Sequence, residues 1–171
     1  MWRQVVRNLR DGPASEPVGE LARDSVAALV AHLQGTARSK LGRSLAIRHV
    51  DSGSCNGCEL EIRALNNVIY DLERFGLRFV VSPRHADVLL VTGPLTRNLR
   101  EAVKQAWQAT PDPKWVVAVG DCAADGGVFK GSYAINGGIG AALPIDLVIS
   151  GCPPTPMQLL AGLRLLLEAH A

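Results

Sequence analysis

From residue 44 onward, short runs of β-branched and aliphatic residues alternate with segments in which apolar residues recur at helical spacing. The runs predict five strands, at residues 44–50, 77–82, 87–92, 115–119 and 145–150. The intervening segments predict helices at residues 59–71, 97–108 and 155–169. The runs VLLV, WVVAV and DLVI are continuous rather than alternating, as in strands covered on both faces. The pattern therefore predicts an α/β domain, residues 44–171, with a mostly parallel sheet flanked by helices.

Residues 1–43 carry a different pattern. A stretch with Gly, Pro and Ser at residues 11–17 precedes one amphipathic segment. The apolar face of that segment includes Val18, Leu21, Ala28, Leu29 and Leu33. A basic stretch follows it, at residues 38–43. We expect an N-terminal helical extension that docks on another surface, joined to the domain by a linker.

Composition and charge exclude some classes of protein. The chain is 47% hydrophobic and 20% charged, which fits a packed core and excludes wholesale disorder. The net charge of +2 is too small to indicate nucleic-acid binding. Residues 1–50 hold 8 basic and 4 acidic side chains, and the remaining residues hold 10 and 12, so the basic charge lies in the first part. This extension could contact an acidic partner or an anionic membrane, or could be a solvated tail.

The compartment follows from the apolar segments. The first ten residues contain three arginines, and no uninterrupted apolar segment of a secretory signal follows them. No stretch approaches the roughly 18 to 20 apolar residues that span a bilayer. We expect a cytosolic chain with reduced thiols, which argues against disulfide bonds.

The chain has four cysteines, and the predicted topology brings them together. Cys55 and Cys58 lie in the turn between the first strand and the first helix. Cys122 directly follows the fourth strand, and Cys152 the fifth. The carboxyl ends of parallel strands meet at one edge, where ligands usually bind. The four thiols are therefore predicted to share one site.

Three kinds of site fit four cysteines. Zinc usually takes paired knuckles on small ribbons, whereas this chain has one CxxC and two isolated cysteines. A thioredoxin-like redox pair would leave Cys122 and Cys152 unexplained. A [4Fe-4S] cluster, contacted from several loops, fits the spacing better. Glycines beside the cysteines would let the backbone approach the cluster. The zinc and redox-pair interpretations remain open on these grounds.

Five motifs occur in an order that is specific to one family: CNGCE (55–59), SPRHAD (82–87), LLVTGP (89–94), GDC followed by GG (120–127) and GCPP (151–154). On these motifs the chain resembles the small subunit of membrane-bound, energy-converting [NiFe] hydrogenases of the formate-hydrogenlyase, hydrogenase-4 and carbon-monoxide-induced types. That subunit is homologous to the 20 kDa subunit of respiratory complex I. The resemblance covers residues 44–168 and leaves the first 43 residues without a motif.

The resemblance implies a flavodoxin-like fold that carries one proximal [4Fe-4S] cluster. The ligand set carries over to Cys55, Cys58, Cys122 and Cys152. Complex I subunits typically have two adjacent cysteines where this chain has CNGC, so the CxxC favours the hydrogenase branch. The alternative is a complex I-like subunit that passes electrons to quinone. No cysteine is left for a nickel site, so the chain is expected to relay electrons to a partner.

The resemblance also implies partners and a location. The expected partners are a [NiFe]-hydrogenase-like large subunit, a ferredoxin-like iron–sulfur subunit and membrane subunits, without nucleic acid. The whole complex would lie at the cytoplasmic face of the inner membrane.

Three further residues are candidates for supporting roles. Glu59 is either a first-turn acid that the helix dipole favours or a proton-linked group. Arg84 could stabilise the charge of the cluster, and His85 could titrate near it or be an exposed turn residue.

Overall fold

The structure is a computed structural model that describes residues 42–75 and 77–169, together with residues 28, 31, 32, 35, 36 and 39. Most of the expected N-terminal helix therefore lies outside the described residues. From the extension, His32 is described, and its Nδ1 lies 3.9 Å from Glu168 Oε1 near the C-terminus of the chain.

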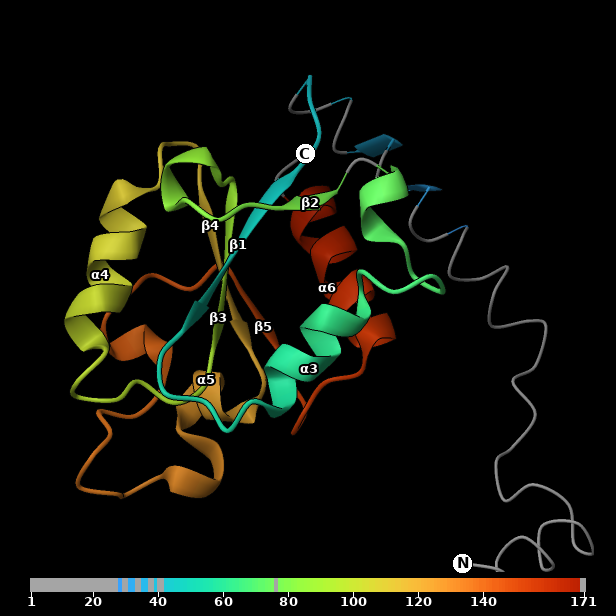
Figure 1. The fold of residues 1–171 in the computed structure, drawn as a ribbon. Coiled ribbons are helices and arrows are strands. Elements are labelled where there is room, and N and C mark those ends of the chain that lie inside the picture. Colours follow the sequence, from blue (N-terminus) through green and yellow to red (C-terminus); the bar gives the residue numbers. More distant parts are fainter. Residues whose placement is uncertain are drawn as a thin grey trace, which may run out of the picture.

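Five parallel strands form the sheet in the described residues: β1 (Ala46–Asp51), β2 (Arg78–Phe79), β3 (Val88–Thr92), β4 (Trp115–Val119) and β5 (Leu147–Ile149). Their order is β2-β1-β3-β4-β5, which is the flavodoxin-like order. The predicted α/β class with a parallel sheet is confirmed. All five carboxyl ends point to the same edge of the sheet (Figure 1).

Helices cover both faces of the sheet (Figure 1). On one face lie α3 (Gly57–Ala64) and α6 (Pro156–Ala169), and on the other lies α4 (Arg100–Ala109). The place of β3 between two helical layers explains why its sequence is continuously apolar. Val88 and Leu90 join the core under α3 and α6, whereas Leu89 and Val91 join the core under α4. Each face buries alternate residues, so a strand between two helical layers needs apolar residues at every position.

The amino edge of the sheet is fixed by one buried acid. Asp87 accepts a hydrogen bond from the Ala46 backbone N–H at 2.9 Å. It also accepts a bidentate pair of hydrogen bonds from the Arg43 guanidinium. The Asp87 side chain is 4% exposed, so its charge is compensated in place by Arg43. This pairing ties the last residues of the extension to the start of β1 and β3.

The helices differ from the prediction at some ends. The helix predicted at residues 59–71 ends at Ala64, because the Asn67 side chain accepts the N–H groups of Ile69 and Tyr70 and so competes with the helix. The strand predicted at 77–82 pairs over Arg78–Phe79 alone, and the 3-10 helix η2 (Pro83–His85) follows it. Sequence reasoning also missed α5 (Asp121–Asp125), a short helix between Gly120 and Gly126.

Candidate functional site

The four cysteines meet at the carboxyl edge of the sheet. Cys55 and Cys58 lie where the turn after β1 opens α3, Cys122 lies in α5 after β4, and Cys152 follows β5. One cavity is lined by all four. Its other lining residues are Ser54, Gly57, Gly93, Asp121, Gly151 and Pro153. The topology therefore brings together the thiols that the sequence predicted to share a site.

Two glycines have no side chain in the space that the thiols occupy. A Cβ at Gly120 would lie 2.8 Å from Cys58 Sγ, and a Cβ at Gly127 would lie 2.9 Å from Cys122 Sγ. Both positions have positive φ, at 88° and 50°, which an L side chain rarely adopts. Any larger residue at either position would displace a thiol from the cavity.

The electrostatics of the cavity disfavour bare thiolates. Burial, followed by the charges of Glu59 and the other cysteines, raises the pKa of the Cys58 thiol to about 12. Burial and the neighbouring Cys152 also raise the pKa of Cys122. None of the four cysteines forms a disulfide. Four thiols gathered in this way can all lose their protons only if a strong positive charge lies between them.

The donor set and the shape of the cavity fit an iron–sulfur cluster. Four sulfur ligands from three loops, with glycine backbone packed against two of them, are what such a cluster requires. Among the described residues, no group of three or more His, Cys, Asp or Glu side chains is gathered closely enough for a single metal ion. The fit rests on the cavity that all four thiols line.

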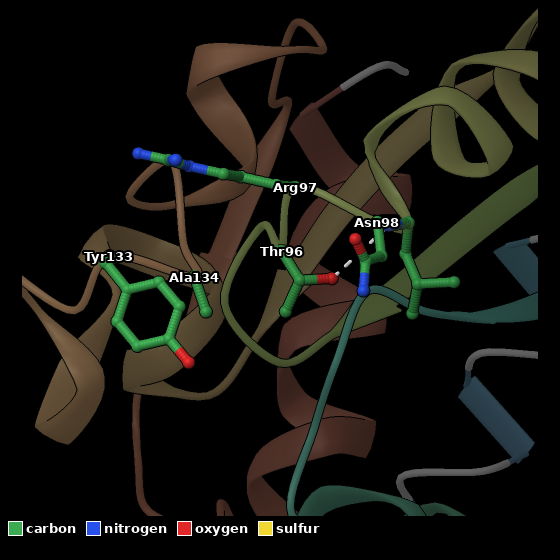
Figure 2. A pocket seen from close by; sticks show the side chains of 6 residues that line it. Thr96, Arg97, Asn98, Tyr133 and Ala134 are labelled. Atoms are coloured by element: carbon green, nitrogen blue, oxygen red, sulfur yellow. Dashed lines mark hydrogen bonds between the residues drawn. The ribbon is translucent and has the colours of Figure 1, made fainter.

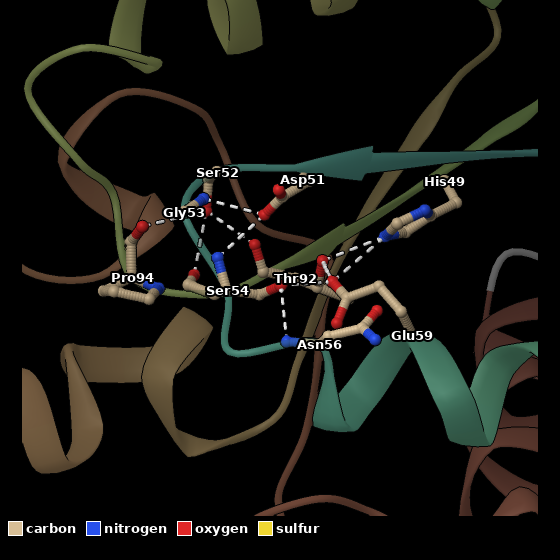
Figure 3. A network of polar contacts seen from close by, with 10 residues as sticks. His49, Asp51, Ser52, Gly53, Ser54, Asn56, Glu59, Thr92 and Pro94 are labelled. Carbon is tan, nitrogen blue, oxygen red and sulfur yellow. Dashed lines mark hydrogen bonds and ion pairs between the residues drawn. The ribbon is translucent and has the colours of Figure 1, made fainter.

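Glu59, which directly follows Cys58, lies in a polar network (Figure 3). Its Oε1 accepts hydrogen bonds from the Ser54 hydroxyl at 2.6 Å and from the Thr92 hydroxyl. His49 Nε2 lies 2.9 Å from Thr92 Oγ1 and 3.5 Å from Glu59 Oε1. The network joins β1, β3, the cysteine turn and α3, so it fixes the turn that holds Cys55 and Cys58.

The direction of the hydrogen bonds in this network can be deduced. The Thr92 hydroxyl has one proton, and that proton is donated to Glu59. His49 Nε2 must therefore carry a proton and donate it to Thr92 Oγ1. Burial lowers the pKa of His49 against the opposing effect of Glu59, which favours a neutral ring protonated at Nε2. Two hydroxyl groups thus donate to the carboxylate of Glu59, and His49 donates to one of these hydroxyls.

Glu59 is only 8% exposed, and its Oε2 is a buried side-chain atom without a hydrogen-bond partner. It also occupies the first turn of α3, where the helix dipole favours an acid. The position in the first turn agrees with an acid that the helix dipole favours, and the buried, unpartnered Oε2 leaves a proton-linked role open. The two hydroxyl groups that donate to Oε1 are an additional reason for an acid at this position. A neutral side chain at this position would leave Ser54 and Thr92 without a charged acceptor.

Arg84 and His85 do not join the cysteines. They lie in η2, which precedes β3 at the amino edge of the sheet, while α5 and the start of α3 lie at the opposite edge (Figure 1). The register explains this placement, because Val88 at the start of β3 pairs with Ile47 near the start of β1. The expected roles for Arg84 and His85 at the cluster have no geometric support in the structure.

Three residues of the network were not identified from the sequence: His49, Ser54 and Thr92. A signal for two of them exists in the pattern. Thr92 is the one polar residue at the end of the continuous apolar run of β3, and His49 interrupts the apolar positions of β1. A polar side chain at the carboxyl end of a buried strand is well placed to take part in a site.

The profile of the family described as NADH ubiquinone oxidoreductase, 20 Kd subunit, matches residues 55–166, which is more than half of the chain. The chain belongs to this family. The matched region begins at Cys55 and contains all four cysteines, so the four thiols that line the cavity lie within the part that the 20 Kd subunit family shares. The resemblance inferred from the five motifs is confirmed.

Two similar curated proteins belong to hydrogenase systems by name. Formate hydrogenlyase subunit 7 of Escherichia coli is 44% identical over 138 residues, covering 81% of this chain and 54% of that protein. The probable membrane-bound hydrogenase subunit mbhJ of Pyrococcus furiosus is 50% identical over 131 residues, covering 77% of this chain and 78% of that protein. The chain thus spans about half the length of the first relative and over three quarters of the second.

Solved structures agree on the fold. A chain from the membrane-bound sulfane sulfur reductase, an archaeal respiratory membrane complex, is 35% identical with a TM-score of 0.66, covering 80% of this chain and 74% of that chain. A chain of the [NiFeSe] hydrogenase from Desulfovibrio vulgaris has a TM-score of 0.56 at 20% identity, covering 75% and 61% of the two chains, which supports the fold alone. The 20 Kd subunit family therefore shares this α/β architecture with hydrogenase chains.

Proposed function

We propose that this chain is an electron-transfer subunit that holds one [4Fe-4S] cluster on Cys55, Cys58, Cys122 and Cys152. In this proposal the cluster relays electrons to the [NiFe] site of a partner large subunit in a membrane-associated hydrogenase complex. The observation that carries the proposal is the single cavity lined by all four thiols. When bound, a [4Fe-4S] cluster accepts and releases electrons at a potential set by its charge, burial and hydrogen bonds.

The residues around the cavity have separate roles in this proposal. The four thiols, deprotonated on binding, hold the cluster at the edge of a rigid sheet. Gly120 and Gly127 keep two sulfur positions free of steric conflict. The network of Ser54, Glu59 and Thr92 holds the turn of Cys55 and Cys58 in place. Ligand positions that are fixed in this way limit the reorganisation that accompanies electron transfer.

The chain is proposed as a relay rather than as the site of catalysis. All four of its cysteines line the one cavity, so none remains to bind a nickel ion. The two relatives named for hydrogenase systems are 44% and 50% identical to this chain, which supports a hydrogenase-type complex. We propose that the further partners are a ferredoxin-like iron–sulfur subunit and membrane subunits at the cytoplasmic face of the membrane.

In the described residues, no helix is long and apolar enough to cross a bilayer. We propose attachment to a membrane complex for two reasons. One relative is named as a subunit of a membrane-bound hydrogenase, and the first 50 residues carry a net basic charge. In the proposal, residues 1–43 form an extension that docks on a membrane subunit or on a sister subunit.

A complex I-like function is the second candidate. The B-type subunit of the NADH-quinone oxidoreductase of a Geobacter species is 45% identical over 114 residues, covering 67% of this chain and 66% of that protein. In that case the same four thiols would hold a cluster that passes electrons to quinone. The CxxC at Cys55 and Cys58 favours the hydrogenase branch.

Purification of the chain with its partners separates the two candidates. A tag on this chain, isolation under anaerobic conditions and sequencing of the co-purifying large subunit would show whether that subunit carries two CxxC pairs. The hydrogenase proposal expects both pairs, together with nickel in the purified complex. A large subunit without these cysteines and without nickel would favour the quinone-reducing alternative.

A further inference from the structure

Among the described residues, the wall of the four-cysteine cavity contains one carboxylate, that of Asp121, and no basic side chain. The rest of the wall consists of the cysteines, glycines, Ser54 and Pro153. A separate cavity with a volume of about 570 Å³ shares none of these residues (Figure 2). That separate cavity is lined by Thr96, Arg97, Asn98, Leu99, Tyr133 and Ala134. Asp121 is thus the carboxylate that borders the thiol cavity itself.

Asp121 joins the loop of Cys122 to the loop of Cys152. Its backbone N–H donates to the Gly151 carbonyl at 3.0 Å, and its Oδ1 accepts the Gly151 N–H at 2.8 Å. Asp121 directly precedes Cys122, and Gly151 directly precedes Cys152. This reciprocal pair of hydrogen bonds therefore connects the two segments that carry the isolated cysteines.

The reciprocal pair continues the β4–β5 ladder beyond the ends of the two strands. The last paired residues are Val119 and Ile149, and the Gly120 N–H then donates to the Ile149 carbonyl at 2.8 Å. At Asp121 the backbone turns into α5, so the side chain accepts the N–H that a strand carbonyl would otherwise accept. In the described part of the chain, the hydrogen bonds of residues 150–154 both go to Asp121. Loss of the carboxylate would leave this loop with one hydrogen bond.

The opposite end of the same two strands has a matching arrangement. The Asp146 backbone N–H donates to the Val116 carbonyl at 2.9 Å, and Asp146 Oδ2 accepts the Val116 N–H at 2.7 Å. Asp146 directly precedes β5, at the amino edge of the sheet, and both aspartates are exposed. Asp121 and Asp146 therefore make the same bonds between β4 and β5, but only Asp121 borders the thiols.

We propose that Asp121 is a positioning residue of the cysteine site, which holds the Cys152 loop against the Cys122 loop and places a negative charge at the wall of the cavity. This charge opposes the addition of an electron, so it lowers the reduction potential of a cluster held by the thiols. The effect on the potential rests on the proposed function, whereas the joining of the two loops does not. Reduction adds one electron, and no bond forms or breaks.

Two substitutions separate the hydrogen bond from the charge. Asp121→Asn keeps an oxygen that accepts the Gly151 N–H and removes the charge, whereas Asp121→Ala removes both. Asp146→Asn and Asp146→Ala make the same changes at the amino edge and are the matched controls. The full chain, purified anaerobically, is analysed for iron and titrated with dithionite, and EPR reports the reduced cluster. Mass spectrometry follows hydrogen exchange in the segment around Gly151.

Asp121→Asn should keep its iron and raise the potential, so that the ratio of reduced to oxidised cluster at the wild-type midpoint increases by about threefold or more. The increase should shrink at high salt, because Asp121 is exposed. Exchange around Gly151 should stay close to that of the wild type in Asp121→Asn and become about tenfold faster in Asp121→Ala. Asp121→Ala should also raise the potential and lose iron faster to a chelator. Neither Asp146 variant should change the potential or the exchange around Gly151.

An unchanged potential in Asp121→Asn, or an equal increase in Asp146→Asn, would overturn the effect of the charge. Equal exchange around Gly151 in Asp121→Ala and Asp146→Ala would contradict the joining of the two loops by the carboxylate. A wild-type chain without iron would refute the proposed function and, with it, the effect on the potential. The exchange measurement would in that case still test the contact between Asp121 and Gly151, because it needs no bound cluster.

Discussion

The Thr92 hydroxyl donates a hydrogen bond to Glu59 Oε1, although 33 positions separate the two residues in the sequence. Thr92 ends β3, and Glu59 lies in the first turn of α3 directly after Cys58. The bond therefore links the middle of the sheet to the segment that carries half of the cysteine set. The Ser54 hydroxyl donates to the same oxygen, so the two ends of the turn from Ser54 to Glu59 are joined by a hydrogen bond as well.

Removal of this bond is predicted to destabilise the protein. Thr92→Val keeps the shape of the side chain and leaves Glu59 and His49 without their shared partner, at a cost of about 2 kcal/mol, as expected for a hydrogen bond to a charged group. Thr110→Val, which removes a hydroxyl bonded to the Ala106 carbonyl, is the control and should cost about 1 kcal/mol. Urea unfolding measures both values, and an equal loss in the two variants would contradict the role of Thr92.

Gly120→Ala is predicted to impair cluster incorporation. The added Cβ would lie 2.8 Å from Cys58 Sγ, so that thiol would have to leave its position in the cavity. Gly131→Ala is a matched control, because Gly131 has nearly the same φ, 85° against 88°, and nothing within 4 Å of the added Cβ. Iron per chain should fall below about half of the wild-type value in Gly120→Ala alone, since both glycines have a φ that an L side chain rarely adopts but only the Cβ at position 120 would meet a thiol. A similar loss in both would show that strain, and not the sulfur contact, is responsible.

The stability of the protein is predicted to fall in acid partly through His49. Burial lowers the pKa of this side chain below its usual value of 6.5, so the unfolded chain takes up a proton that the folded chain does not. Stability should decline as the pH falls through about 6.5 and level off once the pH lies below the pKa of the folded state.

His49→Gln keeps a donor for Thr92 but cannot titrate, so its stability should fall less steeply between about pH 7 and pH 5. Thermal unfolding at closely spaced pH values provides the comparison. Measurement of both proteins at pH 8, where the imidazole is neutral in both states, gives the baseline. Parallel pH profiles for the two proteins would exclude His49 as the titrating group.

Deletion of residues 1–40 is predicted to release the chain from membranes while leaving the cluster in place. The prediction rests on the amphipathic segment and on the net positive charge of the first 50 residues. Fractionation of cells that express the full and shortened chains gives the distribution, and the EPR signal of the shortened chain reports on the cluster. A shortened chain that still fractionates with membranes would count against this role.

The sheet was predictable because its strands are continuous apolar runs. The strand predicted at residues 115–119 has the same first and last residues as β4, since both faces of its WVVAV segment are buried. The predicted gathering of the four cysteines followed from the parallel topology alone. The end of α3 was not predictable from periodicity, because the Asn67 side chain accepts backbone N–H groups that a longer helix would need.

The environment of the site was harder to predict. Arg84 and His85 were placed near the cluster by resemblance, but the pairing of Val88 with Ile47 sets their segment at the amino edge. His49 and Thr92 meet Glu59 only because β1 and β3 are neighbours in register, with His49 opposite Leu90 and Asp51 opposite Thr92. Contacts of this kind depend on strand order and register, which one sequence does not reveal.

Analysis of iron and acid-labile sulfide in the anaerobically purified chain tests the central claim most directly. A [4Fe-4S] cluster on the four cysteines requires about four iron and four sulfide per chain. Cys122→Ser should lower both values and abolish or convert the EPR signal of the reduced protein. Stoichiometric zinc without iron, or an unchanged spectrum in Cys122→Ser, would contradict the account.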